Sequence, residues 1–199
     1  MTETFLSFAL FTIIATLSPG GATTLATASG VRFGYRRSMP LMLGIAAGLA
    51  ILASAGATGL GALLQAVPAL QVAIKLVGTV YLLWLAVQIW NAGRPQDPDS
   101  AGQAPHGFLT GVALLLLNPK GWAMTMAAAA SFAALSAEPL MLAAIMAATF
   151  ASAAVASLSV WCLGGTLLAR TLSTEAQWRF VNRGLGALLT ASIVPLWMP

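Results

Sequence analysis

Six long apolar stretches with almost no charged residues constrain this chain more than any other feature of its sequence. A run of about 20 apolar residues is the length that crosses the hydrocarbon core of a bilayer as a helix. A chain with 59% hydrophobic and 7% charged residues also cannot cover a water-soluble surface. The sequence therefore predicts an all-α integral membrane protein of about six transmembrane helices. The expected spans are Thr4 to Ser29, Ser38 to Leu64, Pro68 to Trp90, Gly107 to Ala133, Leu140 to Leu168 and Val181 to Met198.

The arginines predict how these spans are oriented. The connections after the second and fourth spans contain no Lys or Arg, whereas those after the first, third and fifth contain Arg32, Arg36, Arg37, Arg94, Arg170, Arg179 and Arg183. By the positive-inside rule the arginine-bearing connections are cytoplasmic, so both termini are expected outside, on the periplasmic face of a bacterial inner membrane. The net charge of +4 is then explained by contacts with the lipid bilayer and does not call for a nucleic-acid partner.

A short internal repeat divides the chain into two halves. The first span contains Ser18-Pro19-Gly20-Gly21 and the fourth contains Asn118-Pro119-Lys120-Gly121, and the two prolines are 100 residues apart. Each half contains three predicted spans, and the motif lies in the first of the three. We therefore expect one transmembrane domain over 1–199, with repeat one at 1–90, a polar cytoplasmic linker at 91–106 and repeat two at 107–199. Because each half has an odd number of spans, the second half is expected to be inverted.

The two motifs predict broken helices. Proline and glycine in the middle of a span remove backbone hydrogen bonds, which lipid tolerates only where protein or a cavity covers the freed groups. One such proline is most simply a kink, but matched interruptions in two halves point to the binding site of a transporter. Threonines at three- or four-residue steps near the first break, Thr16 and Thr23 among them, share one helix face and are candidates to line the same cavity.

Lys120 is the deepest charge in the predicted spans. It lies about thirteen residues, or ~20 Å, into the fourth span, where an unpaired charge costs roughly 2.5 to 3.5 kcal/mol on insertion scales. Lys75 lies closer to the end of its span and can extend its side chain toward the surface. No Asp or Glu lies well inside any span. A buried cation without a buried carboxylate suits a substrate that carries a carboxylate, such as an amino acid.

Other classes of function find little support in the residues. The single cysteine, Cys162, cannot form an internal disulfide or a thiol relay, and no cluster of His, Asp, Glu or Cys within the spans suggests an enzyme, a metal site or a cofactor. The phosphate-binding pattern GxxxxGK[ST] is absent from the sequence. Energy for transport would have to come from an ion gradient or a partner. The alternative that stays open is a non-transporting membrane scaffold or a small subunit of a larger complex.

Four groups of residues along the chain form a recognisable pattern. They are Ser18-Pro19-Gly20, then Gly34, Arg36, Arg37, Gly44 and Gly48, then Lys75, Gly78, Tyr81 and Leu82, and finally Phe108, Gly111 and Asn118-Pro119-Lys120. With these residues the chain resembles, over nearly its whole length, the LysE/RhtB family of bacterial amino-acid exporters. The resemblance implies efflux of amino acids or related metabolites, driven by the proton gradient, in the inner membrane and in a homodimer. The family's first motif continues as Pro-Gly-Pro with a following Asn, where this chain has Gly21 and Ala22.

The two motifs, the depth of Lys120 in its span and the family resemblance together predict one substrate site at the two breaks. Because a cationic side chain would need a buried carboxylate, neutral amino acids such as threonine or homoserine are favoured over lysine as substrates. The candidate substrate-binding residues are Thr16, Ser18, Pro19, Gly20, Gly21, Thr23, Lys75, Tyr81, Asn118, Pro119 and Lys120.

Overall fold

The computed structural model describes residues 2–59, 66–94 and 105–197, and every regular element in these ranges is a helix. Three helices are long and apolar enough to cross a membrane, namely Gly21–Ala57, Val72–Trp90 and Pro139–Thr171, and Thr2–Leu17 is apolar but shorter. The prediction of an all-α chain with apolar helices long enough to span a membrane is thus confirmed. The elements are α1 (Thr2–Leu17), α2 (Gly21–Ala57), α4 (Pro68–Trp90), α5 (Phe108–Leu116), α6 (Pro119–Ser131), the short 3-10 helix η1 (Ala133–Leu135), α7 (Pro139–Thr171), α8 (Glu175–Ala191) and α9 (Val194–Trp197).

Helix α2 consists of two helical segments joined by a sharp reversal at Gly34. The backbone of Gly34 has φ 75° and ψ 172°, a region that essentially only glycine enters. The Ser29 and Ser38 hydroxyl oxygens are 2.7 Å apart, although residues nine positions apart in a straight helix are separated by about 13 Å. The chain therefore folds back on itself here. We refer to 21–33 as the first α2 segment and to 35–57 as the second α2 segment.

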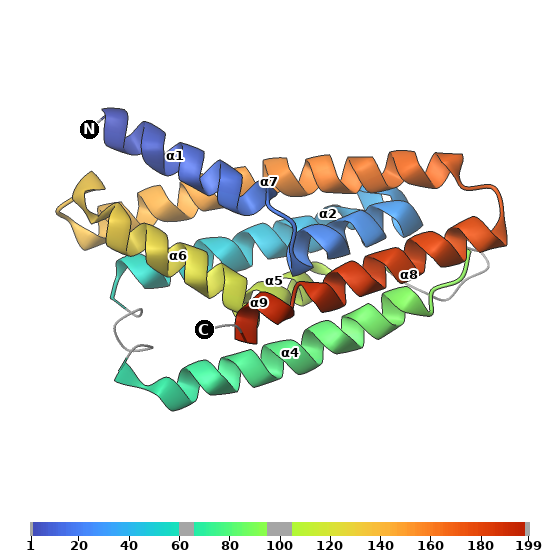
Figure 1. The fold of residues 1–199 in the computed structure, drawn as a ribbon. Helices are drawn as coiled ribbons and strands as arrows, with labels where there is room; N and C mark the ends of the chain where they lie inside the picture. The colour runs from blue at the N-terminus through green and yellow to red at the C-terminus, as the bar shows by residue number, and fades with distance from the viewer. Residues whose placement is uncertain (1, 60–65, 95–104, 198–199) are drawn as a thin grey trace.

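The helices lie lengthwise along one common axis and alternate in direction (Figure 1). Helix α1 and the first α2 segment run the same way, one after the other, and the second α2 segment returns beside them. Helices α4 and α7 run in the direction of α1, whereas α5, α6 and α8 run in the opposite direction. The two interrupted passes, α1 with the first α2 segment and α5 with α6, are therefore antiparallel.

Close helix packing depends on small residues, as is common between helices in a membrane. A Cβ atom added at Gly30, in the first α2 segment, would lie 2.1 Å from the Cys162 carbonyl oxygen on α7. A Cβ atom added at Gly44, in the second α2 segment, would lie 2.0 Å from the Phe108 carbonyl oxygen on α5. The first broken pass thus packs on α7, and the second packs on the second α2 segment.

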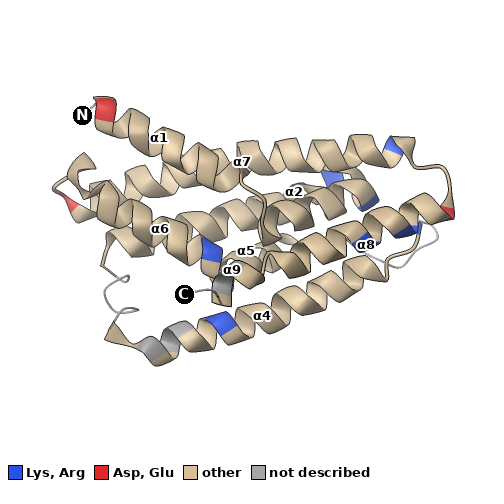
Figure 2. Cartoon of the chain, in the orientation of Figure 1, with Lys and Arg blue, Asp and Glu red and all other residues tan. Residues whose placement is uncertain are grey.

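The basic residues gather at one end of the bundle (Figure 2). This end contains the reversal at Gly34, the end of α4 and the connection from α7 to α8, which are the segments that bear the arginines. Glu3 and Glu138 lie at the starts of α1 and α7, at the opposite end. Two basic residues lie away from both ends, Lys75 on α4 and Lys120 on α6.

Candidate functional site

The two helix breaks lie against each other and are joined by Lys120. Helix α1 ends at Leu17 and α2 begins at Gly21, while α5 ends at Leu116 and α6 begins at Pro119. The Lys120 Nζ atom donates to the Ser18 carbonyl oxygen at 2.8 Å, to the Ser18 hydroxyl at 2.7 Å and to the Pro19 carbonyl oxygen at 3.3 Å. An ammonium has three donors, so these contacts use all of them.

The local sequence explains why α6 begins where it does. Pro119 occupies the first turn of α6, where its missing N–H is no loss, and the Asn118 side chain caps the helix by accepting from the Lys120 N–H at 3.0 Å. The Trp122 indole donates to the Leu116 carbonyl oxygen across the break at 2.8 Å. Lys120 therefore starts at the positive end of α6 and reaches the negative end of α1, where the helix dipole favours a cation.

The carbonyls at the end of α1 receive donors from outside their own helix. The last carbonyls of any helix lack an intrahelical partner, and an unpaired carbonyl in hydrocarbon costs several kcal/mol. The Ser157 hydroxyl donates to the Thr16 carbonyl oxygen at 2.8 Å, and the Trp161 indole donates to the Leu17 carbonyl oxygen at 3.1 Å. Together with Lys120, these two α7 side chains donate hydrogen bonds to the carbonyls at the first break. The end of α1 therefore does not leave these carbonyls unpaired.

Ser157 and Trp161 were not among the residues predicted from the sequence. They are four positions apart in the middle of α7, so they lie on one helix face. Tryptophan in membrane helices is more usual at the two interfaces than in the middle of a span. This unusual placement of Trp161 was the available signal, although it does not say which backbone the indole meets.

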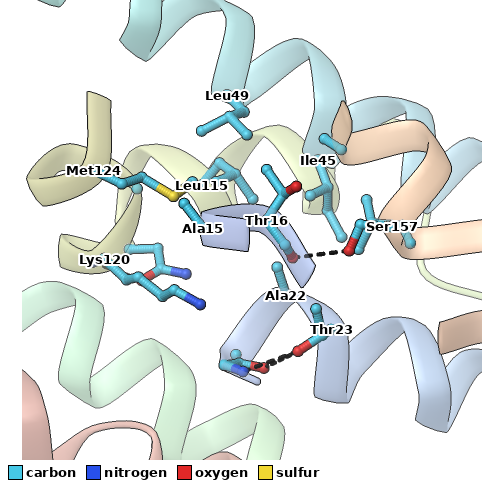
Figure 3. A pocket seen from close by; sticks show the side chains of 16 residues that line it. Ala15, Thr16, Ala22, Thr23, Ile45, Leu49, Leu115, Lys120, Met124 and Ser157 are labelled. Atoms are coloured by element: carbon cyan, nitrogen blue, oxygen red, sulfur yellow. Dashed lines mark hydrogen bonds between the residues drawn. The ribbon is translucent and has the colours of Figure 1, made fainter. Parts of the chain in front are cut away.

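A small central cavity of about 40 Å³ lies between the two breaks, α7 and the second α2 segment (Figure 3). It is much smaller than the 300 to 1,000 Å³ typical of small-molecule sites and holds little more than one water molecule. In this structure the cavity is therefore too small to hold an amino acid. The predicted site residues that line the cavity are Thr16, Gly20, Gly21, Thr23, Asn118 and Lys120.

The other predicted site residues occupy different positions around the breaks. Ser18 and Pro19 bind the Lys120 ammonium, and Pro119 starts α6. Lys75 and Tyr81 are on α4 and are not among the residues that line the central cavity. The Tyr81 hydroxyl instead faces the Thr110 carbonyl oxygen on α5, at 3.5 Å.

The threonines near the first break bond mainly to their own backbone. The Thr16 hydroxyl donates to the Thr12 carbonyl oxygen at 2.8 Å, one turn earlier in α1. The Thr23 hydroxyl oxygen accepts from the Gly20 N–H at 2.9 Å and so caps the start of α2. Both residues border the cavity, but these hydroxyls are already engaged in hydrogen bonds within their own helices.

Metal binding finds no support in the part of the chain that the structure describes. No group of three or more His, Cys, Asp or Glu residues is close enough there to hold a metal ion. The chemistry at the breaks is therefore that of an ammonium, hydroxyls and backbone carbonyls.

Known proteins resemble this chain over most of its length. The family model for the LysE type translocator matches residues 13–193. A cysteine/O-acetylserine efflux protein of Klebsiella pneumoniae is 29% identical over 191 residues, which cover 95% of each chain. An uncharacterized membrane protein of Vibrio cholerae is 32% identical over 123 residues, 58% of each chain. A threonine efflux protein of Salmonella typhi is 28% identical over 124 residues, 58% of this chain and 60% of its own.

These matches differ in extent. The aligned segment spans less than two thirds of the Vibrio and Salmonella proteins but nearly the full length of the Klebsiella protein. No solved structure matches the chain.

Proposed function

Because the chain belongs to the LysE type translocator family, we propose that it is a secondary-active exporter that moves amino acids or related small metabolites out of the cytoplasm. The observation that carries this proposal is the Lys120 ammonium, which joins two broken helices beside a small central cavity. The names of the relatives support the class of substrate, since they describe efflux of cysteine, O-acetylserine, threonine, and homoserine with its lactone.

Charge complementarity favours neutral amino acids within this class. The α-carboxylate of an amino acid would meet Lys120, and the Ser18 and Pro19 carbonyl oxygens beside it can accept from the α-ammonium. The described acidic residues, Glu3, Glu138 and Glu175, all lie near helix starts at the ends of the bundle. A second positive charge on the substrate would therefore have no carboxylate partner in the interior of the described bundle.

An ion gradient is the proposed source of energy. The sequence lacks the nucleotide-binding pattern GxxxxGK[ST], so the chain does not carry the usual loop for ATP-driven transport. We propose that the proton gradient drives export and that Lys120 either binds the substrate carboxylate or takes part in proton movement. In either case, displacement of the Lys120 ammonium from the Ser18 carbonyl would release one break from the other and so change the central cavity.

We propose that the bundle is one transporter domain of six spans in two inverted repeats, with the linker 91–106 between them. Two observations support this arrangement. The two broken passes are antiparallel (Figure 1), as inversion requires. The first broken pass packs on α7, the second span of repeat two, and the second broken pass packs on the second α2 segment, the second span of repeat one. Of the linker, 95–104 lies outside the described residues.

The arginine-rich end is proposed to face the cytoplasm of a bacterial inner membrane, which leaves both termini in the periplasm. A reporter enzyme that is active only in the periplasm should therefore be active when fused after Pro199 and inactive when fused near Asp97. The activity of the two fusions, normalised to their abundance, checks this expectation. The reverse pattern would reject the proposed orientation.

Growth in the presence of inhibitory amino acids tests the proposed function in cells. Expression of the protein should raise the concentration of threonine, homoserine, cysteine or O-acetylserine that halves growth, because export lowers the internal concentration. Cells that produce an equal amount of the Lys120→Met variant provide the control. Equal sensitivity with and without the wild-type protein for every amino acid would favour a non-transporting membrane scaffold.

A further inference from the structure

Two helices, α2 and α6, start beside the central cavity (Figure 3). At the start of α6 the Asn118 side chain caps the first available N–H group, that of Lys120. At the start of α2 the Gly21 and Ala22 N–H groups have no acceptor among the described residues. The local reason is Gly20, which occupies the capping position of α2 and has no side chain that could accept from them.

The Asn118 amide adds further unpaired donors at this helix start. Its Oδ1 atom accepts from the Lys120 N–H, so the capping bond fixes which end of the amide is the oxygen. Within the described part of the chain, the Nδ2 atom donates to no other group. A Cβ atom added at Gly21 would lie 3.8 Å from Nδ2. Because Asn118 is only 5% exposed and lines the central cavity, its free N–H donors are directed at the start of α2 from inside the bundle.

The surroundings of this helix start are positive. The N-terminus of a helix carries a partial positive charge and free N–H groups, and both favour an anion. The Lys120 ammonium lies beside it, since a Cβ atom added at Gly20 would be 3.2 Å from Nζ. No acidic residue is among the described residues that line the central cavity. Unpaired N–H groups are costly away from water, so these donors call for an acceptor that enters the cavity.

A carboxylate matches this set of donors. It has two acceptor oxygens, so one can accept from the start of α2 while the other accepts from Asn118 Nδ2. These donors belong to the two different breaks, so a carboxylate between them would contact both. The cavity is too small for an entire amino acid, so binding requires the residues around it to move.

We propose that the start of α2 and the Asn118 amide form the carboxylate subsite of the exporter, with the Gly21 N–H, the Ala22 N–H and Asn118 Nδ2 as its donors. The inference rests on the proposed function and deepens it, because it assigns the carboxylate to groups that are unpaired. The Lys120 ammonium, whose three donors are bonded at the first break, supplies the neighbouring positive charge. The ligand class is a small solute with a free carboxylate, and a neutral carboxamide of similar shape binds more weakly.

Two substitutions of Gly21 isolate one of these donors. Gly21→Pro removes the N–H group, whereas Gly21→Ala keeps it and adds a Cβ atom at about the same place, 3.0 Å from the end of the Leu82 side chain. Proline is favoured at the first position of a helix, and the extended backbone of Gly20, with φ 179° and ψ −175°, is one that can precede a proline. The comparison of the two variants therefore measures the loss of the N–H group separately from the added bulk.

Transport kinetics in lipid vesicles test the subsite. The purified wild-type, Gly21→Ala and Gly21→Pro proteins would be supplied with labelled threonine, homoserine and cysteine, and the carboxamide of each amino acid would be added as a competitor. Loss of a hydrogen bond to a charged group should raise KM for the transported amino acid about tenfold or more in Gly21→Pro relative to Gly21→Ala. The inhibition constant of the carboxamide should be the same in these two variants.

Asn118→Ser tests the second donor independently. A serine hydroxyl is also a good helix cap, so α6 should keep its start, but the amide donors are lost. This variant should likewise raise KM for the amino acid about tenfold and change the inhibition constant of the carboxamide much less. It decides the question alone if Gly21→Pro does not accumulate in the membrane.

Three results would overturn the carboxylate subsite while leaving export established. These are equal KM values for Gly21→Pro and Gly21→Ala, a wild-type KM for Asn118→Ser, and constants for the amino acid and its carboxamide that change by the same factor. The last result would mean that the substitutions disturb the break as a whole. Wild-type vesicles that transport none of the three amino acids would instead reject the proposed function.

Discussion

Replacement of Lys120 by methionine is expected to abolish export while the protein still inserts into the membrane at normal abundance. The substitution removes the ammonium that donates to the Ser18 and Pro19 carbonyl oxygens, and with it the proposed partner of the substrate carboxylate. Methionine fills a similar volume and is compatible with lipid, so the fold should persist. A lost charged hydrogen bond in the transport cycle corresponds to a fall in rate of about a hundredfold. Vesicle transport rates, divided by the amount of protein on an immunoblot, measure the effect.

Two further lysine variants separate charge from position. Lys120→Arg should restore export only poorly, because a planar guanidinium cannot replace the compact ammonium that contacts three acceptors around Ser18. Lys75→Met should have a smaller effect, since Lys75 does not line the central cavity. Full export by Lys120→Met would show that the lysine only pairs with backbone carbonyls and that the substrate binds elsewhere.

Replacement of Gly78 by alanine is expected to disrupt the second break. A Cβ atom at this position would lie 1.9 Å from the Leu117 carbonyl oxygen and 3.5 Å from the Pro119 ring, so α4 would have to move away from the start of α6. Overpacking of this kind costs about 1 to 3 kcal/mol. We expect a lower thermal unfolding midpoint of the purified protein in detergent, together with a large loss of transport because Asn118 and Lys120 would shift with the break.

Gly164→Ala is the matched control for this experiment. Gly164 is also within a long helix, α7, but apart from its chain neighbours and the adjacent backbone of α7 no heavy atom lies within 4 Å of where its Cβ atom would be. Alanine should therefore fit there, and it favours a helix by about 1 kcal/mol relative to glycine. Wild-type stability and transport for Gly78→Ala would show that α4 does not pack tightly on the second break.

The sequence predicted the helices well where apolar runs have clear ends. The expected span Pro68 to Trp90 coincides with α4, and the expected breaks fall between α1 and α2 and between α5 and α6. The last helix was placed less well, because α8 begins at Glu175, six residues before the expected Val181. Thr174 and Gln177 cap its first turn, and the charged residues Glu175 and Arg179 near its start hid the helix from a search for apolar stretches.

The hairpin within α2 shows why connections are harder to predict than spans. The sequence suggested a loop between Ser29 and Ser38, because glycine and arginines interrupt the apolar pattern there. In the structure Gly34 alone has non-helical dihedral angles, and the helix continues on both sides of it. A single residue with positive φ is enough to reverse the chain, and apolar periodicity carries no information about it.

The candidate site was predictable in part. Proline, glycine and a deep lysine at matched positions identified both breaks, because each is costly in a membrane and so needs a reason. The partners on α7 were not predictable, since the sequence does not show that Ser157 and Trp161 lie at the end of α1, even though a tryptophan in the middle of a span is unusual. Lys75 and Tyr81 were included through the family resemblance, and their contribution to binding stays a prediction.

Transport by the purified protein in lipid vesicles tests the central claim most directly. The vesicles would contain the wild-type or the Lys120→Met protein, and the flux of labelled cysteine, threonine and homoserine would be followed with and without an imposed proton gradient. We expect the wild-type protein to move at least one of these amino acids faster when the gradient is present, and the Lys120→Met protein to give the flux of protein-free vesicles. Wild-type flux equal to that of protein-free vesicles, for every amino acid and gradient, would contradict the assignment of this chain as an amino-acid exporter.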